Sequence, residues 1–214
     1  MSRVVGRDAL LEEVRALLAR GESVALCGPT GVGKSALLDV IEHAAHQQHG
    51  AEVLRATGAA DESALPFAAL RDLLAQCPAD LVAQMPDDVR EVVSSGLVGL
   101  AATHERRSDL AAAVHALLEQ WSTPDRPVLL LLDDVQWLDA DSSAIVGYAR
   151  RRLGGRVLVV ATVGDTPASA ERPGETELDR LTVDVSGLTH LDVPPLDPVD
   201  MLELLCSHGL RPDV

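Results

Sequence analysis

The chain has 214 residues, of which 47% are apolar and 24% charged, so it can form a buried core and is neither disordered nor collagen-like. Its net charge is −15 and only 2% of its residues are aromatic. These values argue against binding to phosphate backbones and against stacking on single-stranded nucleic acid, so we expect no direct DNA contact from this segment.

The sequence carries no clear signal for a membrane span, for secretion or for disulfide bonds. The longest apolar run, 128–132, is too short to span a bilayer, and the N-terminus has no hydrophobic signal region. The three cysteines are scattered and form neither a disulfide framework nor a metal-binding pattern. We therefore expect a cytoplasmic protein that does not contact a membrane. Of the 18 basic residues, Lys34 is the only lysine.

The first third of the chain alternates helical and strand patterns. A helix is expected over 8–20 with Asp8 as its cap, followed by a short buried strand over 23–27. A glycine-rich loop leads to a helix that begins near Lys34, and a second strand is expected over 52–56. From 66 to 121 the pattern is helical, with breaks at Pro78, Pro86 and Gly96.

The rest of the chain continues this alternation. The expected elements are a fully buried strand over 128–134, a helix over 142–153, a strand over 156–162, an exposed loop over 166–176, a weaker strand over 190–193, and a final helix from Asp197 or Pro198. A strand without polar alternation is typical of a parallel strand covered on both faces. The order predicts an α/β fold with right-handed crossovers.

The segment Gly28–Ser35 carries the strongest chemical signal. It matches G-x-x-x-x-G-K-[ST], with a strand before it and a helix after it. Such a loop turns backbone N–H groups toward phosphates, Lys34 can reach the β and γ phosphates, and the Ser35 hydroxyl can bind Mg²⁺. The alternative is a turn that only joins strand to helix. The expected nucleotide-binding residues of this segment and of the position after it are Gly28, Pro29, Thr30, Gly31, Val32, Gly33, Lys34, Ser35 and Ala36.

Two acidic residues, Asp133 and Asp134, end the strongest strand. The carboxyl ends of strands in open α/β sheets are where ligands bind, so both lie beside the glycine-rich loop in the expected fold. We expect Asp133 to hold Mg²⁺ through water and Asp134 to polarise the attacking water, with Lys34 and Asp134 as the catalytic residues. The alternative is that both carboxylates serve as caps or turn formers.

Three consecutive arginines, 150–152, close the helix before the fourth strand. Basic residues at that position complement the helix dipole, which is the interpretation that we favour. The other interpretation is an arginine finger that reaches a nucleotide in the same chain or in a neighbouring subunit, which would make the chain self-associate.

Four stretches together resemble the N-terminal ATPase module of the large ATP-binding regulators of the LuxR family, which are AAA-like signal-transduction ATPases. They are VVGRD at 4–8, GPTGVGKS at 28–35, LPFAALRDLL at 65–74 and LLLLDDVQWLDADS at 129–142. The resemblance implies a P-loop NTPase three-layer sandwich with a central parallel sheet, in which the fourth strand lies between the first and the third. It also implies ATP or ADP with Mg²⁺ as ligands, and Gly6 and Arg7 near the adenine or ribose.

The resemblance further implies a domain organisation. Residues 1–187 would form the nucleotide-binding domain, with a helical insert at about 58–121, and 188–214 would begin a truncated helical domain. In that family DNA binding belongs to a C-terminal helix-turn-helix, which this sequence lacks. The chain is therefore expected to be an N-terminal fragment of such a regulator, the alternative being a short relative that lost the helix-turn-helix.

One position departs from the family pattern. Where the family usually places an arginine that senses the γ-phosphate, this chain has Gly164 within ATVGD. We therefore expect an ATP-binding regulatory switch with weak hydrolysis. The alternatives are a metabolic P-loop kinase or transferase, and an oligomeric AAA-like loader ATPase.

Overall fold

The computed structural model describes residues 4–48, 51–84, 87, 90, 104–164 and 187–207. Its centre is a sheet of five parallel strands in the order β2-β3-β4-β1-β5. The strands are β1 (Val24–Cys27), β2 (Glu52–Thr57), β3 (Val128–Asp133), β4 (Val157–Val163) and β5 (Thr189–Asp192). The α/β sandwich predicted from the sequence is confirmed, including the insertion of β4 between β1 and β3.

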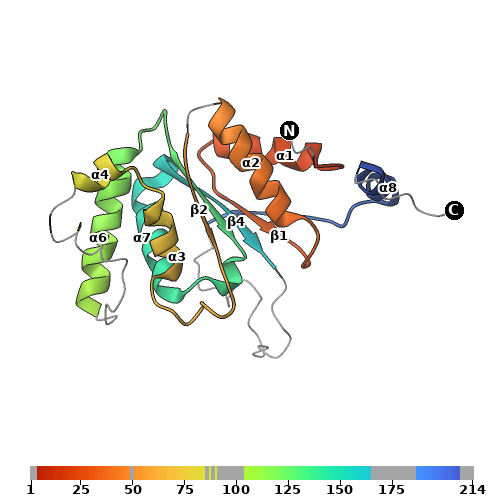
Figure 1. Ribbon diagram of the computed structural model, residues 1–214. Helices are drawn as coiled ribbons and strands as arrows, with labels where there is room; N and C mark the ends of the chain where they lie inside the picture. The colour runs from red at the N-terminus through yellow and green to blue at the C-terminus, as the bar shows by residue number, and fades with distance from the viewer. Residues whose placement is uncertain are drawn as a thin grey trace.

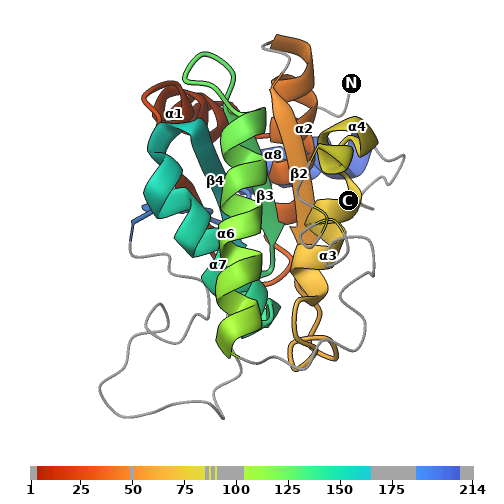
Figure 2. The same ribbon diagram turned by 90° about the vertical axis from the view of Figure 1, so that its left-hand side faces the viewer.

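Helices cover both faces of the sheet (Figure 1). The helices that the structure describes are α1 (Asp8–Ala19), α2 (Lys34–Gln48), α3 (Ala68–Ala75), α4 (Ala79–Ala83), α6 (His104–Trp121), α7 (Ala140–Leu153) and α8 (Pro198–Ser207), with short 3-10 turns η1 (Val135–Trp137) and η2 (Gly154–Arg156). One face carries α1 and α2, and the other carries α3 and α7, with α6 packed on α7 (Figure 2).

The strand β3 shows why the sheet needs cover on both faces. All six of its residues are buried. Leu130 and Leu132 belong to the core under α3, α6 and α7, whereas Leu129 and Leu131 belong to the core under α1 and α2. Because side chains alternate between the faces of a strand, a run of leucines serves both cores at once.

The helical insert follows β2. Its helices α3, α4 and α6 agree with the helical pattern expected over 66–121, and Pro78 precedes the first residue of α4. The expected breaks at Pro86 and Gly96, and the expected loop over 166–176, lie outside the described residues.

The start of α1 differs from the expectation. Asp8 is the first helical residue and not the cap; Arg7 takes the cap position, and no side chain there bonds to the helix backbone. The Asp8 carboxylate instead lies in the first turn, where a negative charge complements the helix dipole.

The strand β5 pairs with β1 through residues 189–192. A domain boundary at 187/188, as expected from the sequence, would separate this strand from the sheet to which it belongs. The sheet therefore continues to Asp192. Helix α8 follows, and Asp197 caps it by accepting hydrogen bonds from the backbone of Val199 and Asp200, each over 2.8 Å.

Candidate functional site

The glycine-rich loop joins β1 to α2 at the carboxyl edge of the sheet. Gly31 and Gly33 have φ values of +83° and +100°, which residues with a side chain rarely adopt. A Cβ atom placed on either glycine would meet no other atom within 4 Å, so space lies open over the loop. A loop with this backbone and this open side can receive an anion on its N–H groups.

Lys34 is folded back onto the loop. Its Nζ donates hydrogen bonds to the backbone oxygens of Gly28 (2.8 Å) and Pro29 (2.9 Å), and the residue is buried. An ammonium group has three donors, so Lys34 keeps one donor beyond these two bonds. The structure thus holds the only lysine of the chain at the loop itself.

The N-terminal segment also reaches this loop. Arg7 is buried and its Nη2 donates a hydrogen bond to the backbone oxygen of Val32 over 3.2 Å. Gly6 has a φ of +68°, and a Cβ atom there would lie 2.0 Å from Oδ2 of Asp200 on α8. The structure therefore brings Gly6 and Arg7 together beside the loop, with α8 packed against them.

The two acidic residues lie at the same edge of the sheet. Asp133 ends β3 and is buried; its Oδ1 accepts a hydrogen bond from the hydroxyl of Thr162 on β4 over 2.5 Å. Asp134 follows in the left-handed conformation, at φ 50° and ψ 53°, and its Oδ1 accepts from Nε2 of Gln136 over 3.0 Å. A left-handed aspartate is uncommon, and such conformations cluster at functional sites.

Gly164 lies beside this pair. Its N–H donates to Oε1 of Gln136 over 3.0 Å, and a Cβ atom there would lie 2.8 Å from Nε2 of Gln136 and 3.6 Å from Oδ1 of Asp134. The position where an arginine was expected is therefore adjacent to the acidic pair, and Gln136 fills the space next to it.

The residues present suit Mg²⁺ with a nucleotide. Ser35 stands exposed in the first turn of α2, and Asp133 supplies a carboxylate; oxygen donors of these kinds are those that Mg²⁺ prefers. Among the described residues, no group of three or more His, Cys, Asp or Glu side chains could hold a metal ion without other ligands. A Mg²⁺ ion held by Ser35 and Asp133 would need further oxygen ligands, such as phosphate oxygens and water, to complete its coordination.

Two groups of contacts were not found from the sequence. Arg55 on β2 forms ion pairs with Asp39 and Glu42 of α2, and its Nη2 lies 3.7 Å from Oδ2 of Asp133. A charged residue within the strand pattern EVLRAT was the available signal, but its partners depend on the register of β2 with β3 and on the placement of α2.

The second group fastens the helical insert to the segment after the acidic pair. Buried Asp139 accepts hydrogen bonds from the backbone of Phe67 (2.8 Å) and Ala69 (3.2 Å), and Oγ of Ser142 accepts from the backbone of Leu70 (2.8 Å). Phe67 itself is left-handed, at φ 64°. The LPFAAL stretch and the DDVQWLDADS stretch are thus in direct contact.

The arginines of α7 do not face the loop. Arg150 donates to the backbone oxygen of Gly187 over 3.1 Å, and the guanidinium of Arg152 lies 3.8 Å from the centre of the Tyr148 ring. They lie where β4 begins, and its seven residues span about 20 Å to the edge where the loop lies. The suggested finger within the same chain is therefore wrong; an arginine cannot reach across that distance.

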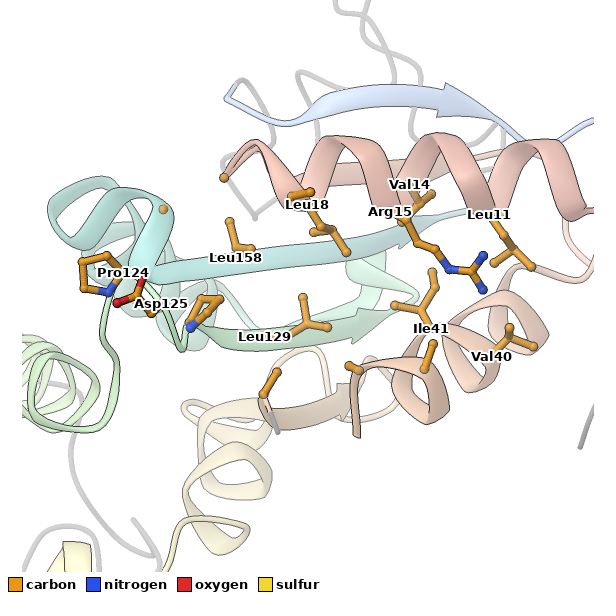
Figure 3. Close-up of a pocket in the computed structure, with 17 residues that line it drawn as sticks. Leu11, Val14, Arg15, Leu18, Val40, Ile41, Pro124, Asp125, Leu129 and Leu158 are labelled. Carbon is orange, nitrogen blue, oxygen red and sulfur yellow. The ribbon is translucent and has the colours of Figure 1, made fainter. Parts of the chain in front are cut away.

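A separate cavity of about 390 Å³ lies between α1 and α2 (Figure 3). Its wall is mainly apolar, with Leu129 and Leu158 at the beginnings of β3 and β4. It is therefore at the edge of the sheet opposite the glycine-rich loop, and none of residues 28–36 lines it.

Across the described parts of the chain, no helix has both the length and the apolarity to cross a membrane.

Comparisons with known proteins agree with this fold. A family model described as an AAA ATPase domain matches residues 3–160. Cdc6p from Pyrobaculum aerophilum superposes with a TM-score of 0.57 and 16% identity, over 98% of this chain and 50% of its own. The Aeropyrum pernix ORC1 protein, solved in complex with DNA, gives a TM-score of 0.62 and 16% identity, over 100% of this chain and 52% of its own.

The chain thus spans about half the length of these two structures. At such identities the likeness concerns the fold. No curated protein matches the chain.

Proposed function

Because the chain belongs to the family of AAA ATPase domains, we propose that it is a regulatory switch that binds ATP or ADP with Mg²⁺ and hydrolyses ATP slowly. The observation that carries this proposal is the position of Lys34, whose ammonium group is held on the backbone of an open glycine-rich loop. A cation and a row of N–H groups at the start of a helix bind phosphates.

Each residue of the loop has a place in this proposal. The backbone from Gly28 to Ala36 would surround the phosphates, and Lys34 would exchange its carbonyl partners for phosphate oxygens. Ser35 and Asp133 would hold Mg²⁺, which when bound neutralises phosphate charge. Asp134 would orient the attacking water. Arg7, bonded to the loop at Val32, would stabilise the loop conformation beside the sugar or base.

Slow turnover follows from the surroundings of Asp134. An arginine that compensates charge on the transferred phosphoryl group contributes roughly 10³–10⁵ in rate. Gly164 cannot supply this charge, and the arginines of α7 lie at the opposite edge of the sheet. We therefore propose a domain that retains its nucleotide, with turnover below about 1 s⁻¹, the low end for enzymes.

The finer role that we propose is the N-terminal ATPase module of a LuxR-type transcriptional regulator. The support is that two stretches which resemble this family, LPFAAL and DDVQWLDADS, bond to each other through Asp139 and Ser142. In this role a helix-turn-helix elsewhere in the regulator would bind DNA, and the present segment would not.

A second candidate, an oligomeric loader ATPase, is favoured by the fold likeness to Cdc6p and ORC1. In that case a neighbouring subunit would supply the arginine that is missing at position 164. Sedimentation with and without ATP is the first test of the second candidate: the loader requires assembly when ATP binds, and a chain that stays monomeric in ATP contradicts it.

Steady-state phosphate release across a range of protein concentrations tests the slow switch. We expect a low rate per chain that does not depend on protein concentration. A fast rate that is independent of concentration contradicts the slow switch, and a rate per chain that rises with concentration supports the loader.

A further inference from the structure

Arg55 places a positive charge next to the acidic residue proposed to hold Mg²⁺. Its Nη1 donates hydrogen bonds to Asp39 Oδ1 (2.6 Å) and Glu42 Oε2 (2.9 Å), both on α2. Its Nη2 lies 3.7 Å from Oδ2 of Asp133. One guanidinium group therefore joins the helix that begins with Lys34 to the end of β3.

The backbone of Arg55 is also hydrogen-bonded, to the side chain of Gln76. The side chain of Gln76, which follows α3, accepts from the Arg55 N–H (2.9 Å) and donates to the Arg55 carbonyl (2.6 Å). Because β2 is the edge strand, these bonds satisfy backbone groups that have no neighbouring strand. The backbone that carries the guanidinium is therefore restrained on the sheet.

The negative charges around Arg55 outnumber its single positive charge. Three carboxylates lie within ion-pair distance of one guanidinium whose side chain is 26% exposed. Burial alone would lower the pKa of Arg55, but its hydrogen bonds to Asp39 and Glu42 outweigh burial and raise it. The group is therefore a permanent cation.

The two oxygens of Asp133 have different surroundings. Oδ1 accepts the hydrogen bond of Thr162, whereas Oδ2 faces Arg55 at a separation too long for a hydrogen bond. The strong bonds of Arg55 go to α2, and its effect on Asp133 is mainly electrostatic. A positive charge at this place stabilises the buried carboxylate and repels a second cation.

We propose that Arg55 is a positioning residue and the internal counter-cation of Asp133, which lowers the affinity of the site for Mg²⁺ and is restrained by Asp39 and Glu42. The proposal rests on the function proposed above, because it concerns the same metal site. Its consequence is that the position of the guanidinium between α2 and β3 sets how strongly nucleotide binding depends on Mg²⁺.

The test is a titration of the chain with a fluorescent, non-hydrolysable ATP analogue, in Mg²⁺ and in EDTA. The quantity compared is the ratio of the Kd in EDTA to the Kd in Mg²⁺. Arg55→Gln should raise this ratio by about threefold to tenfold, since Coulomb repulsion of Mg²⁺ at a partly exposed site is removed. Arg55→Lys keeps the charge and should restore a ratio close to that of the wild type.

Arg126→Gln is the matched control, because Arg126 pairs with Glu52 at the other end of β2; it should leave the ratio unchanged. A second variant removes the charges on α2 that hold Arg55 away from Asp133. Asp39→Asn combined with Glu42→Gln weakens the hold of α2 on Arg55, so the guanidinium can pair with Asp133 and the ratio should fall.

A ratio that is unchanged or lower in Arg55→Gln contradicts the proposal. If that variant does not fold, a ratio that stays the same or rises in the Asp39→Asn, Glu42→Gln protein contradicts it instead. A wild-type chain that binds the analogue in neither condition refutes the proposed function and this proposal together. Nucleotide binding with the wrong direction of change refutes only the role of Arg55.

Discussion

The hydroxyl of Thr162 bonds to both acidic residues of the site: it donates to Oδ1 of Asp133 over 2.5 Å and accepts from the backbone N–H of Asp134 over 2.8 Å. Thr162 is fully buried on β4, so the neighbouring strand fixes where the carboxylate of Asp133 lies. One side chain thereby sets the geometry of the acidic pair.

Thr162→Val preserves the shape of this side chain and removes both hydrogen bonds. It leaves a buried carboxylate oxygen and a backbone N–H without a partner, so we expect the free energy of unfolding to fall by about 1–3 kcal/mol. Mg²⁺-dependent nucleotide affinity should also weaken. Urea denaturation and nucleotide titration check the two effects. Thr189→Val is the control, because the hydroxyl of Thr189 bonds only weakly, to Glu22 at the sheet edge over 3.3 Å.

Substitutions of Asp133 and Asp134 should affect different properties, namely Mg²⁺-dependent nucleotide binding and ATP hydrolysis. Asp133→Ala should lose the Mg²⁺ dependence of nucleotide binding, because it removes the proposed metal-binding carboxylate. Asp134→Asn should bind nucleotide normally and lose the residual hydrolysis. Isothermal titration with Mg²⁺–ATP and a phosphate-release assay measure the two properties. Equal loss of Mg²⁺-dependent affinity in both variants would contradict this division of roles.

Asp139 should matter for stability and not for nucleotide chemistry directly. Asp139→Ala leaves the N–H groups of Phe67, Ala69 and Ser142 without their acceptor, and we expect a loss of about 3 kcal/mol in the free energy of unfolding. Asp109→Ala, an exposed position on α6, is the control and should change stability little. A wild-type denaturation midpoint in Asp139→Ala would show that α3 is held mainly by other contacts.

The positions of the strands along the chain and the glycine-rich loop could be predicted because their signals are local, whereas the place of β4 between β1 and β3 was implied by the family resemblance. The apolar run of β3 and the spacing of Gly28, Gly33 and Lys34 each lie within a few residues of sequence. Asp8 was assigned wrongly as a cap because capping depends on one residue of register. Arg7 occupies that position, and its side chain bonds to Val32 instead of to the helix.

Contacts between distant segments could not be predicted in the same way. The bond from Phe67 to Asp139 joins residues 72 apart, and that from Thr162 to Asp133 joins residues 29 apart. Arg55 approaches Asp133 only because β2 lies beside β3 in a register that pairs Thr57 with Asp133. A single sequence gives no register, so these partners become visible only in the folded chain.

The chain should not bind duplex DNA by itself at physiological salt. Its net charge of −15 repels a phosphate backbone, and two of the three arginines of α7 have partners within the chain, since Arg150 bonds to Gly187 and Arg152 stacks on Tyr148. A mobility-shift titration at two salt concentrations checks this. A shift that weakens with salt would contradict the expectation.

The central claim is that the loop from Gly28 to Ser35 binds nucleotide through Lys34, and calorimetric titration of the wild type and of Lys34→Ala with ATP tests it most directly. Lys34 supplies the only ammonium group at the loop, and its loss leaves phosphate charge uncompensated. We expect clear binding in the wild type, a loss of at least about tenfold in affinity in Lys34→Ala, and no change in Arg20→Ala, which removes an exposed charge paired with Glu22. Equal affinity in wild type and Lys34→Ala would contradict the assignment of the loop.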